Sequence, residues 1–314
     1  MITLQSARKY EELLTGEVEP APYEYATMFK ADGFFARQQA KKRFVLLKGV
    51  DAKLRRVLRA GERVYYVTSG TTVTIAEHFF VGWMANYLNM RALVFTTERV
   101  LLVQIDGGKK KAGALVAQIP YTSLASVKST WTGACRIKLM DRSQHHFVSV
   151  PKADRKFIAD FLADIVQGTA APFGSGARPA GVENLCPHCF THVPGHPAAC
   201  PACTGAFKSP NRAGLLSFFF PGIGDWYLGH RGFAVMEMLS SGFLWLVLVI
   251  TPLLAPADPE MPPLNAGYWG TVALILLAGH SLDAVMTRHF ALKGHHPHGP
   301  APAGGMPPLV SPAR

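Results

Sequence analysis

The sequence predicts a multidomain α+β membrane protein, with a β-barrel or sandwich domain, a small cysteine-rich module and a transmembrane α-hairpin. Three observations predict this organisation: short strand-like runs across residues 63–150, four cysteines between residues 186 and 203, and two long apolar stretches near the C-terminus. Charged residues make up only 17% of the chain and mean hydropathy is +0.14, whereas a soluble domain is roughly a quarter charged. We therefore expect part of the chain to lie in lipid.

The charge of the chain is divided unevenly. The formal net charge is +11 over 314 residues; residues 1–170 hold 25 basic and 15 acidic residues, and residues 171–314 hold 7 and 6. This composition excludes a disordered acidic protein, a collagen and a disulfide-dense secreted miniprotein. The first residues show no basic segment followed by an apolar run, so we expect no cleavable signal peptide.

An N-terminal region, residues 1–60, contains an amphipathic pattern over residues 34–60. Apolar residues from Phe44 to Leu58 fall on one side of a helix, although Arg43 and Val45 interrupt the pattern. Two interpretations stay open: a helix packed on a core with a solvated charged face, or a basic face that contacts anionic lipid or nucleic acid. The basic face consists of Lys41, Lys42, Lys48, Lys53, Arg55, Arg56 and Arg59.

A β domain is predicted over residues 61–168. Short strand-like runs separated by turn residues, at intervals of about 8–12 residues, are typical of a small antiparallel sandwich or barrel. A proline at position 151 ends the β region, and the amphipathic helix predicted over 152–166 follows it. The expected strands cover residues 63–68, 91–95, 100–105, 115–119, 124–130, 136–140 and 146–150.

Two segments of this domain resemble a known family. Ala-Leu-Val-Phe-Thr-Thr-Glu-Arg-Val-Leu-Leu-Val at 92–103 resembles the second hairpin of bacterial pleckstrin-homology-like (PH-like) domains, and Ile-Pro-Tyr-Thr-Ser-Leu-Ala-Ser-Val at 119–127 resembles their following strand. The resemblance covers residues 60–168, implies a barrel capped by the final helix, and implies a binding module. The apolar segment 75–90 departs from the pattern; it predicts either an element packed on the barrel, or an interfacial wedge or self-association surface.

Four cysteines follow a linker at residues 169–184 that is rich in Gly, Ala, Pro and Ser. The pairs Cys186-Pro-His-Cys189 and Cys200-Pro-Ala-Cys203 lie within residues 185–208. Two such pairs present four thiolates to one tetrahedral ion, so we expect a zinc ribbon with structural Zn²⁺, and iron as the alternative metal. The neighbouring His188, His192 and His196 are expected in loops, not as ligands, and Cys135 as a small buried residue.

Two apolar stretches near residues 233–255 and 267–287 are long enough to be transmembrane helices, which need about 20 residues. Basic residues precede the first stretch and follow the second, and the loop at 256–266 has none. The positive-inside rule therefore predicts a protein of the bacterial inner membrane with both termini in the cytoplasm. Thiolate ligands suit a reducing compartment, which agrees with a cytoplasmic location for the cysteine pairs. Residues 213–229 are then expected on the cytoplasmic side, as an interfacial or re-entrant element.

The segment before the first span also resembles a family. Phe-Phe-Phe-Pro-Gly-Ile-Gly-Asp-Trp-Tyr-Leu-Gly-His-Arg-Gly at 218–232 resembles the opening of the TM2 domain family, a two-helix membrane hairpin, over residues 212–290. The usual His-x-Phe-Tyr is replaced by Asp-Trp-Tyr, and the Pro-Gly-x-Gly-x-x-Tyr form is closer to a related bacterial membrane module. The motif residues are Pro221, Gly222, Gly224, Asp225, Trp226, Tyr227, Gly229 and Asp283.

The sequence contains no catalytic triad pattern, phosphate-binding loop or dinucleotide fingerprint, so we expect a protein without enzymatic activity. The main interpretation is a membrane-anchored scaffold or signalling adaptor that binds lipid head groups or an unidentified protein, with homo-oligomers as a further option. A transport or channel subunit is an alternative, because Glu237 and Asp283 lie inside the spans. A nucleic-acid-binding role is disfavoured by the single lysine within 183–210. The tail, residues 294–314, is predicted to be disordered, with only adventitious metal binding by His295, His296 and His298.

Overall fold

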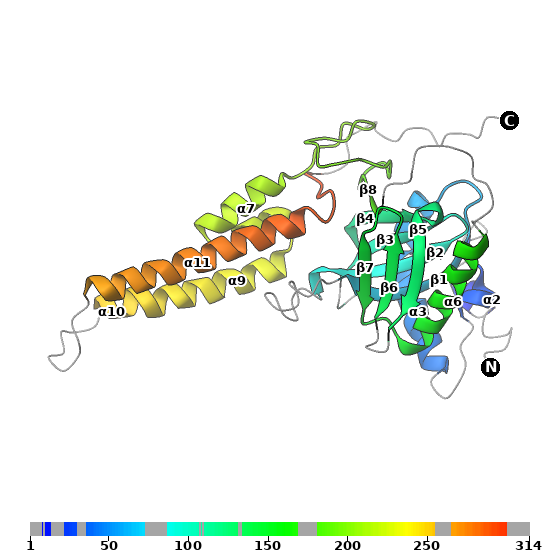
Figure 1. The fold of residues 1–314 in the computed structure, drawn as a ribbon, viewed down its shortest axis with the longest axis horizontal. Helices are drawn as coiled ribbons and strands as arrows, with labels where there is room; N and C mark the ends of the chain where they lie inside the picture. The colour runs from blue at the N-terminus through cyan, green and yellow to red at the C-terminus, as the bar shows by residue number, and fades with distance from the viewer. Residues whose placement is uncertain are drawn as a thin grey trace. The chain divides into compact units, whose positions relative to one another are not determined.

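The computed structural model describes residues 8, 10–13, 22–29, 36–72, 87–106, 108, 110–130, 134–168, 181–254 and 265–299. The chain forms two compact units, Met1–His192 and Val193–Arg314 (Figure 1). Residues 75–86 of the apolar segment, residues 169–180 of the linker and residues 300–314 of the tail lie outside the described part. Within the described part the architecture is mixed α+β, as the sequence predicts.

The first unit is built on one eight-stranded sheet in which every neighbouring pair is antiparallel, in the order β5-β6-β7-β1-β2-β3-β4-β8. Each strand expected between residues 63 and 150 is present. An eighth strand forms where the sequence suggested the junction of linker and ribbon. The strands are β1 (Val64–Thr72), β2 (Met90–Thr96), β3 (Arg99–Ile105), β4 (Ala112–Pro120), β5 (Leu124–Ser129), β6 (Cys135–Leu139), β7 (Gln144–Val148) and β8 (Glu183–Leu185).

The central strands are buried on both faces. Side chains alternate along β2, so Ala92 and Val94 join one apolar core and Leu93 and Phe95 join another. The first core is shared with α3 (Ala36–Val57), and the second with α6 (Lys152–Gly168). This double burial explains why residues 92–95 form a continuous apolar run where a half-exposed strand would alternate with polar residues.

Helix α3 packs on the sheet, which agrees with one of the two interpretations that the sequence left open. Its Leu47, Val50 and Leu54 are fully buried in the core that it shares with the sheet. Gly49, unfavourable in a helix by about 1 kcal/mol, has a packing reason. A Cβ at this position would lie 2.1 Å from the carbonyl oxygen of Lys110, so only glycine permits the close approach. The short helix α2 (Tyr25–Met28) packs in the same core.

The second unit contains two helices that are long and apolar enough to cross a membrane. The first runs over Arg231–Leu254 and comprises α9 (Arg231–Trp245), a π-helical turn η2 (Leu246–Ile250) and α10 (Thr251–Leu254). The second is α11 (Ala266–Ala291), and mean hydropathies are 2.1 and 1.4. Their lengths and composition agree with the predicted spans. Two shorter helices precede them, α7 (Pro210–Phe219) and α8 (Ile223–Leu228).

The start of the C-terminal tail is ordered, which corrects the prediction of disorder for residues 294–299. The backbone N–H of Lys208 donates to the carbonyl of His296 at 2.8 Å, and that of His298 donates to Ala206 at 2.9 Å. The His295 ring stacks on Phe207, with centroids 4.6 Å apart. His295 and His296 are buried. The composition suggested a solvated tail, but these backbone bonds and the stacked ring order its first residues.

Candidate functional site

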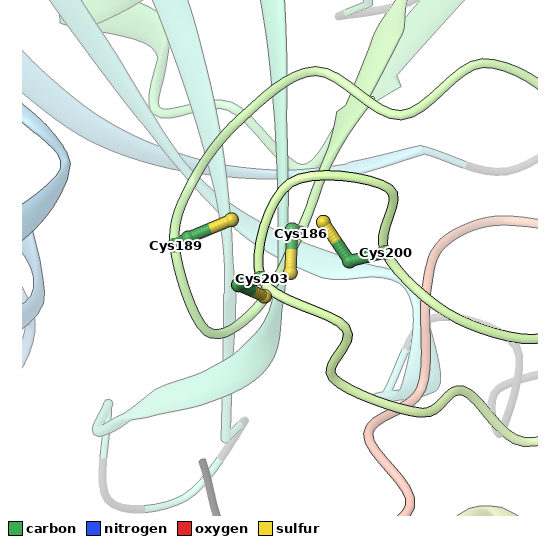
Figure 2. Close-up of side chains that lie close together, drawn as sticks. All are labelled: Cys186, Cys189, Cys200 and Cys203. Carbon is green, nitrogen blue, oxygen red and sulfur yellow. The ribbon is translucent and has the colours of Figure 1, made fainter. Parts of the chain in front are cut away.

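The four clustered cysteines form a candidate metal centre. All four Sγ atoms lie within 4.8 Å of one another, and Figure 2 shows two sulfurs arriving from each of two turns. None of the chain's five cysteines, all within the described part, forms a disulfide. Tetrahedral ligation with Zn–S bonds of about 2.3 Å places the sulfurs about 3.8 Å apart, which is within this limit.

Both cysteine pairs adopt the same local turn. The N–H of Phe190 donates to the carbonyl of Cys186 at 3.0 Å, and the N–H of Thr204 donates to that of Cys200 at 2.9 Å. Phe190 and Thr204, each directly after a pair, have φ values of 59° and 58°. This left-handed residue turns the chain back, and so both sulfurs of a pair face the same point.

The donor set is suited to a structural ion. Cys186, Cys200 and Cys203 are buried and Cys189 is half-buried, so a metal at their centre would be screened from water. Four thiolates complete a tetrahedral site and leave no open position for a substrate. Among the described residues, these cysteines are the only group of three or more His, Cys, Asp or Glu placed to hold a metal. His188, His192 and His196 do not belong to this group.

The exposed face of α3 carries most of the predicted basic residues. Between its ends α3 has eight basic residues and one acidic residue, Asp51. The side chains of Lys41, Lys42, Lys48, Arg55, Arg56 and Arg59 are exposed. Arg43, which interrupts the helical pattern in the sequence, points the other way and is buried. The helix therefore separates a packed apolar side from a solvent-facing basic side.

Some members of this basic face already have protein partners. Arg55 pairs with Asp51 at 3.0 Å, and Arg59, outside the C-terminal end of α3, pairs with Glu98 at 2.7 Å. Lys53 is half-buried and donates to the carbonyls of Gly113 and, at 3.0 Å, Ala114. Burial lowers the pKa of Lys53 to about 8, and the charge of Arg56 adds to this shift. Lys53 thus packs against β4, and the more accessible cations are Lys41, Lys42 and Lys48.

The predicted membrane motif forms the turn between α7 and α8. Pro221 and Gly222 are buried at the turn, and Gly222 has φ 89°. The Gly222 N–H donates to the Asp283 carboxylate at 3.3 Å. Gly224 lets α8 pack on α7, because a Cβ there would lie 2.1 Å from the carbonyl oxygen of Ala213. The glycine pattern therefore corresponds to a tightly packed helical hairpin.

Asp225 is the centre of a buried polar network. Its side chain is fully buried and accepts from Thr287 at 2.7 Å, and its other oxygen lies 2.8 Å from His230 Nδ1. Ser217 lies 3.0 Å from Thr287, which links α7 to α11. The sequence indicated Asp225 and Asp283 but not these three partners. Only the contact with His230, five residues from Asp225, could have been suggested by local sequence, because Thr287 is distant in the chain.

Comparison with known proteins identifies no relative. No protein-family model matches the chain, and no curated protein matches it. One solved structure, the C-terminal domain of an unknown protein from Leishmania infantum, is similar at 10% identity with a TM-score of 0.25. The match covers 39% of this chain and 95% of that chain. A likeness at this level carries no argument about fold or function.

Proposed function

We propose that this protein is a membrane-anchored, non-enzymatic adaptor whose β domain binds anionic lipid head groups through the exposed face of α3. The observation that carries the proposal is the separation of charge on this helix. Lys41, Lys42 and Lys48 are exposed, and none of them forms an ion pair with a carboxylate in the part of the chain that the structure describes. Each basic side chain close to an anionic surface contributes about 1 kcal/mol of attraction.

The topology of the sheet supports a PH-like binding module. Strands β1–β4 follow one another as a meander, β5–β7 form a second meander beyond β1, and α6 packs on the core between them. The resemblance of residues 60–168 to PH-like domains implies a final helix that caps the strands, and α6 lies in the corresponding place in the chain. The α3 helix and β8 are additions to that pattern on the side of the first core.

The cysteine-rich segment, residues 185–208, is proposed to hold one structural Zn²⁺ on Cys186, Cys189, Cys200 and Cys203. The chemistry of the donors supports zinc, because four thiolates in a closed tetrahedral arrangement are a common structural zinc site. When bound, the ion would fix the two turns that lie in sequence between the β domain and the membrane helices. Thiolate ligands also fit a reducing compartment, which supports a cytoplasmic location for this segment.

The helices of the second unit are proposed to anchor the protein in a bacterial inner membrane with both termini in the cytoplasm. Basic residues lie near the start of α9 and near the end of α11, and this placement supports the orientation. Arg231 lies over the ring of Trp226 at 5.8 Å, and Arg212 lies over that of Tyr227 at 5.4 Å. Such cation–aromatic pairs suit the membrane–water interface, where both residue types are enriched.

A binding assay with the full chain tests the lipid-binding proposal. The protein is held in zwitterionic nanodiscs, and capture of separate anionic vesicles is measured as salt is raised. We expect capture at low salt that is lost at high salt, and no capture of zwitterionic vesicles. The variant K41E/K42E/K48E should lose capture, whereas K128E/R136E/K138E, which reverses three exposed charges on β5 and β6, should retain it. Equal loss in both variants would contradict a site on α3.

A further inference from the structure

Helix α7 begins, and helix α8 ends, beside the C-terminal end of α11. At the start of α7, Asn211 accepts from Arg288 Nε at 2.8 Å; near its end, the carbonyl of Phe218 lies 2.8 Å from His280 Nδ1. The chain then turns at Gly222, and α8 returns until Leu228 packs on Ala291 at the end of α11. Figure 1 shows α7 alongside one half of α11.

The depth of this hairpin follows from helix geometry. His280 and Arg288 are eight residues apart, which corresponds to about 12 Å along a helix. One leaflet of a bilayer has a hydrocarbon layer of about 15 Å. The hairpin therefore has the length to enter one leaflet and is too short to cross the membrane.

The tip of the hairpin exposes large apolar side chains. Phe219 is 71% exposed, and Phe218 and Ile223 are exposed as well, as is Leu215 one turn earlier on α7. No charged residue occurs between Arg212 and Asp225, and Asp225 is fully buried in its network. A surface of this composition is unfavourable in water by about 25 cal/mol for each Å² of apolar area.

The base of the hairpin is basic and aromatic. Lys208 and Arg212 lie over the Tyr227 ring at 5.6 and 5.4 Å, and Arg231 lies over Trp226. The Tyr227 hydroxyl also accepts from the N–H of Ser209 at 3.1 Å. From base to tip, the hairpin presents basic side chains, then aromatic rings, then aliphatic and phenyl groups. A lipid leaflet changes from polar to apolar in the same order, from its head groups to its acyl chains.

We propose that α7 and α8 form a re-entrant hairpin whose tip, Phe218–Ile223, inserts among the acyl chains of the leaflet on the basic side. The occupant of the exposed apolar face is lipid, as the graded polarity and the half-membrane depth require. This inference rests on the proposed membrane anchoring of α9 and α11. It selects the re-entrant form over an element that lies flat at the interface.

Photocrosslinking in native membranes tests the insertion directly. A benzophenone amino acid replaces Phe219 in the full chain, and adducts are identified by mass spectrometry after illumination. Two positions with matched exposure serve as references: Phe243 on α9, 68% exposed, and Met140 after β6, 62% exposed. We expect phospholipid adducts at positions 219 and 243, and none above background at position 140. A circular dichroism spectrum that matches that of the unsubstituted protein confirms that each variant is folded.

The outcomes separate the two proposals. Lipid adducts at position 243 with none at 219 would overturn the re-entrant hairpin and leave the anchor intact. Crosslinks from position 219 to a second copy of the chain, or to another protein, would also overturn it and identify the tip as a protein interface. Absence of lipid adducts at both positions would overturn the membrane anchor and the hairpin together.

Discussion

Arg43 of α3 and Asp154 of α6 form a buried ion pair, with Nη2 2.6 Å from Oδ1 and both side chains at most 5% exposed. Asp154 also accepts from the hydroxyls of Tyr66, at 3.0 Å, and Thr68. The Arg43 guanidinium lies over the Tyr66 ring. The pair joins the helix that carries the basic face to the helix that closes the sheet, through strand β1.

Removal of one partner of this pair should destabilise the β domain strongly. Arg43→Ala or Asp154→Ala leaves an uncompensated buried charge, with an expected cost of about 3–5 kcal/mol. The double variant should cost less than the sum of the two. Hydrogen exchange of β1–β3 amides in the full chain measures the change. Arg59→Ala, which breaks the exposed pair with Glu98, should cost less than about 1 kcal/mol; a similar cost for all three single variants would refute this account.

The ion pair between Arg43 and Asp154 could not be predicted from the sequence. The apolar spacing of α3 predicts the helix and its buried side, and Arg43 stands out only as an interruption of that pattern. Its partner lies 111 residues away, and nothing local to either residue connects them. The same holds for Glu62, just before β1, and Arg99, the first residue of β3, which form a second buried pair at 2.8 Å. Long-range polar pairs depend on the final packing, whereas strand and helix patterns are local.

Metal content should depend on the four clustered cysteines alone. We expect close to one zinc per chain in purified protein and loss of zinc in Cys200→Ser. Cys135→Ser is the matched control, because Cys135 is buried in the sheet core and burial raises the pKa of its thiol to about 11. Metal analysis by mass spectrometry decides the question. A metal-free protein with an unchanged fold, or zinc loss in Cys135→Ser, would contradict the assignment.

Topology reporters should place both ends of the chain on the same side of the membrane. Fusions after residue 170 and after Arg314 should report the cytoplasm, and a fusion near residue 262 the opposite side, because the basic residues flank the helices outside that loop. Paired phosphatase and fluorescent-protein activities provide the measurement. A C-terminus on the far side would mean that the chain crosses the membrane an odd number of times, and the two-span anchor would be wrong.

Lys53 should make the stability of the β domain depend on pH. Burial lowers its pKa to about 8 in the folded protein, and the unfolded value is about 10.4. Between these values the unfolded state binds more protons, so stability should rise with pH relative to Lys53→Met. Urea unfolding of both proteins at several pH values measures this difference. A difference that stays constant, or falls as pH rises through 8, would argue against the buried ammonium.

Two parts of the fold differ from the sequence prediction for the same physical reason. Strand β8 has only three residues, and the tail segment after α11 consists mainly of Gly, His and Pro. Neither has a periodic apolar pattern. Both become ordered through backbone hydrogen bonds to distant segments, β4 in one case and residues 206–208 in the other. By contrast, the spacing of the cysteine pairs carried enough local information to predict the metal-binding cluster.

The most direct test of the proposed adaptor is the accessibility of its basic helix at a membrane. The full chain is reconstituted in nanodiscs of anionic or purely zwitterionic lipid, and amine labelling of Lys41, Lys42 and Lys48 is quantified by mass spectrometry, with the exposed Lys138 as the reference. The account predicts slower labelling of the three α3 lysines in anionic nanodiscs at 0.1 M salt. This protection should disappear at 1 M salt, where the Debye length falls from about 10 Å to 3 Å. Equal labelling in both lipids at low salt would contradict the account.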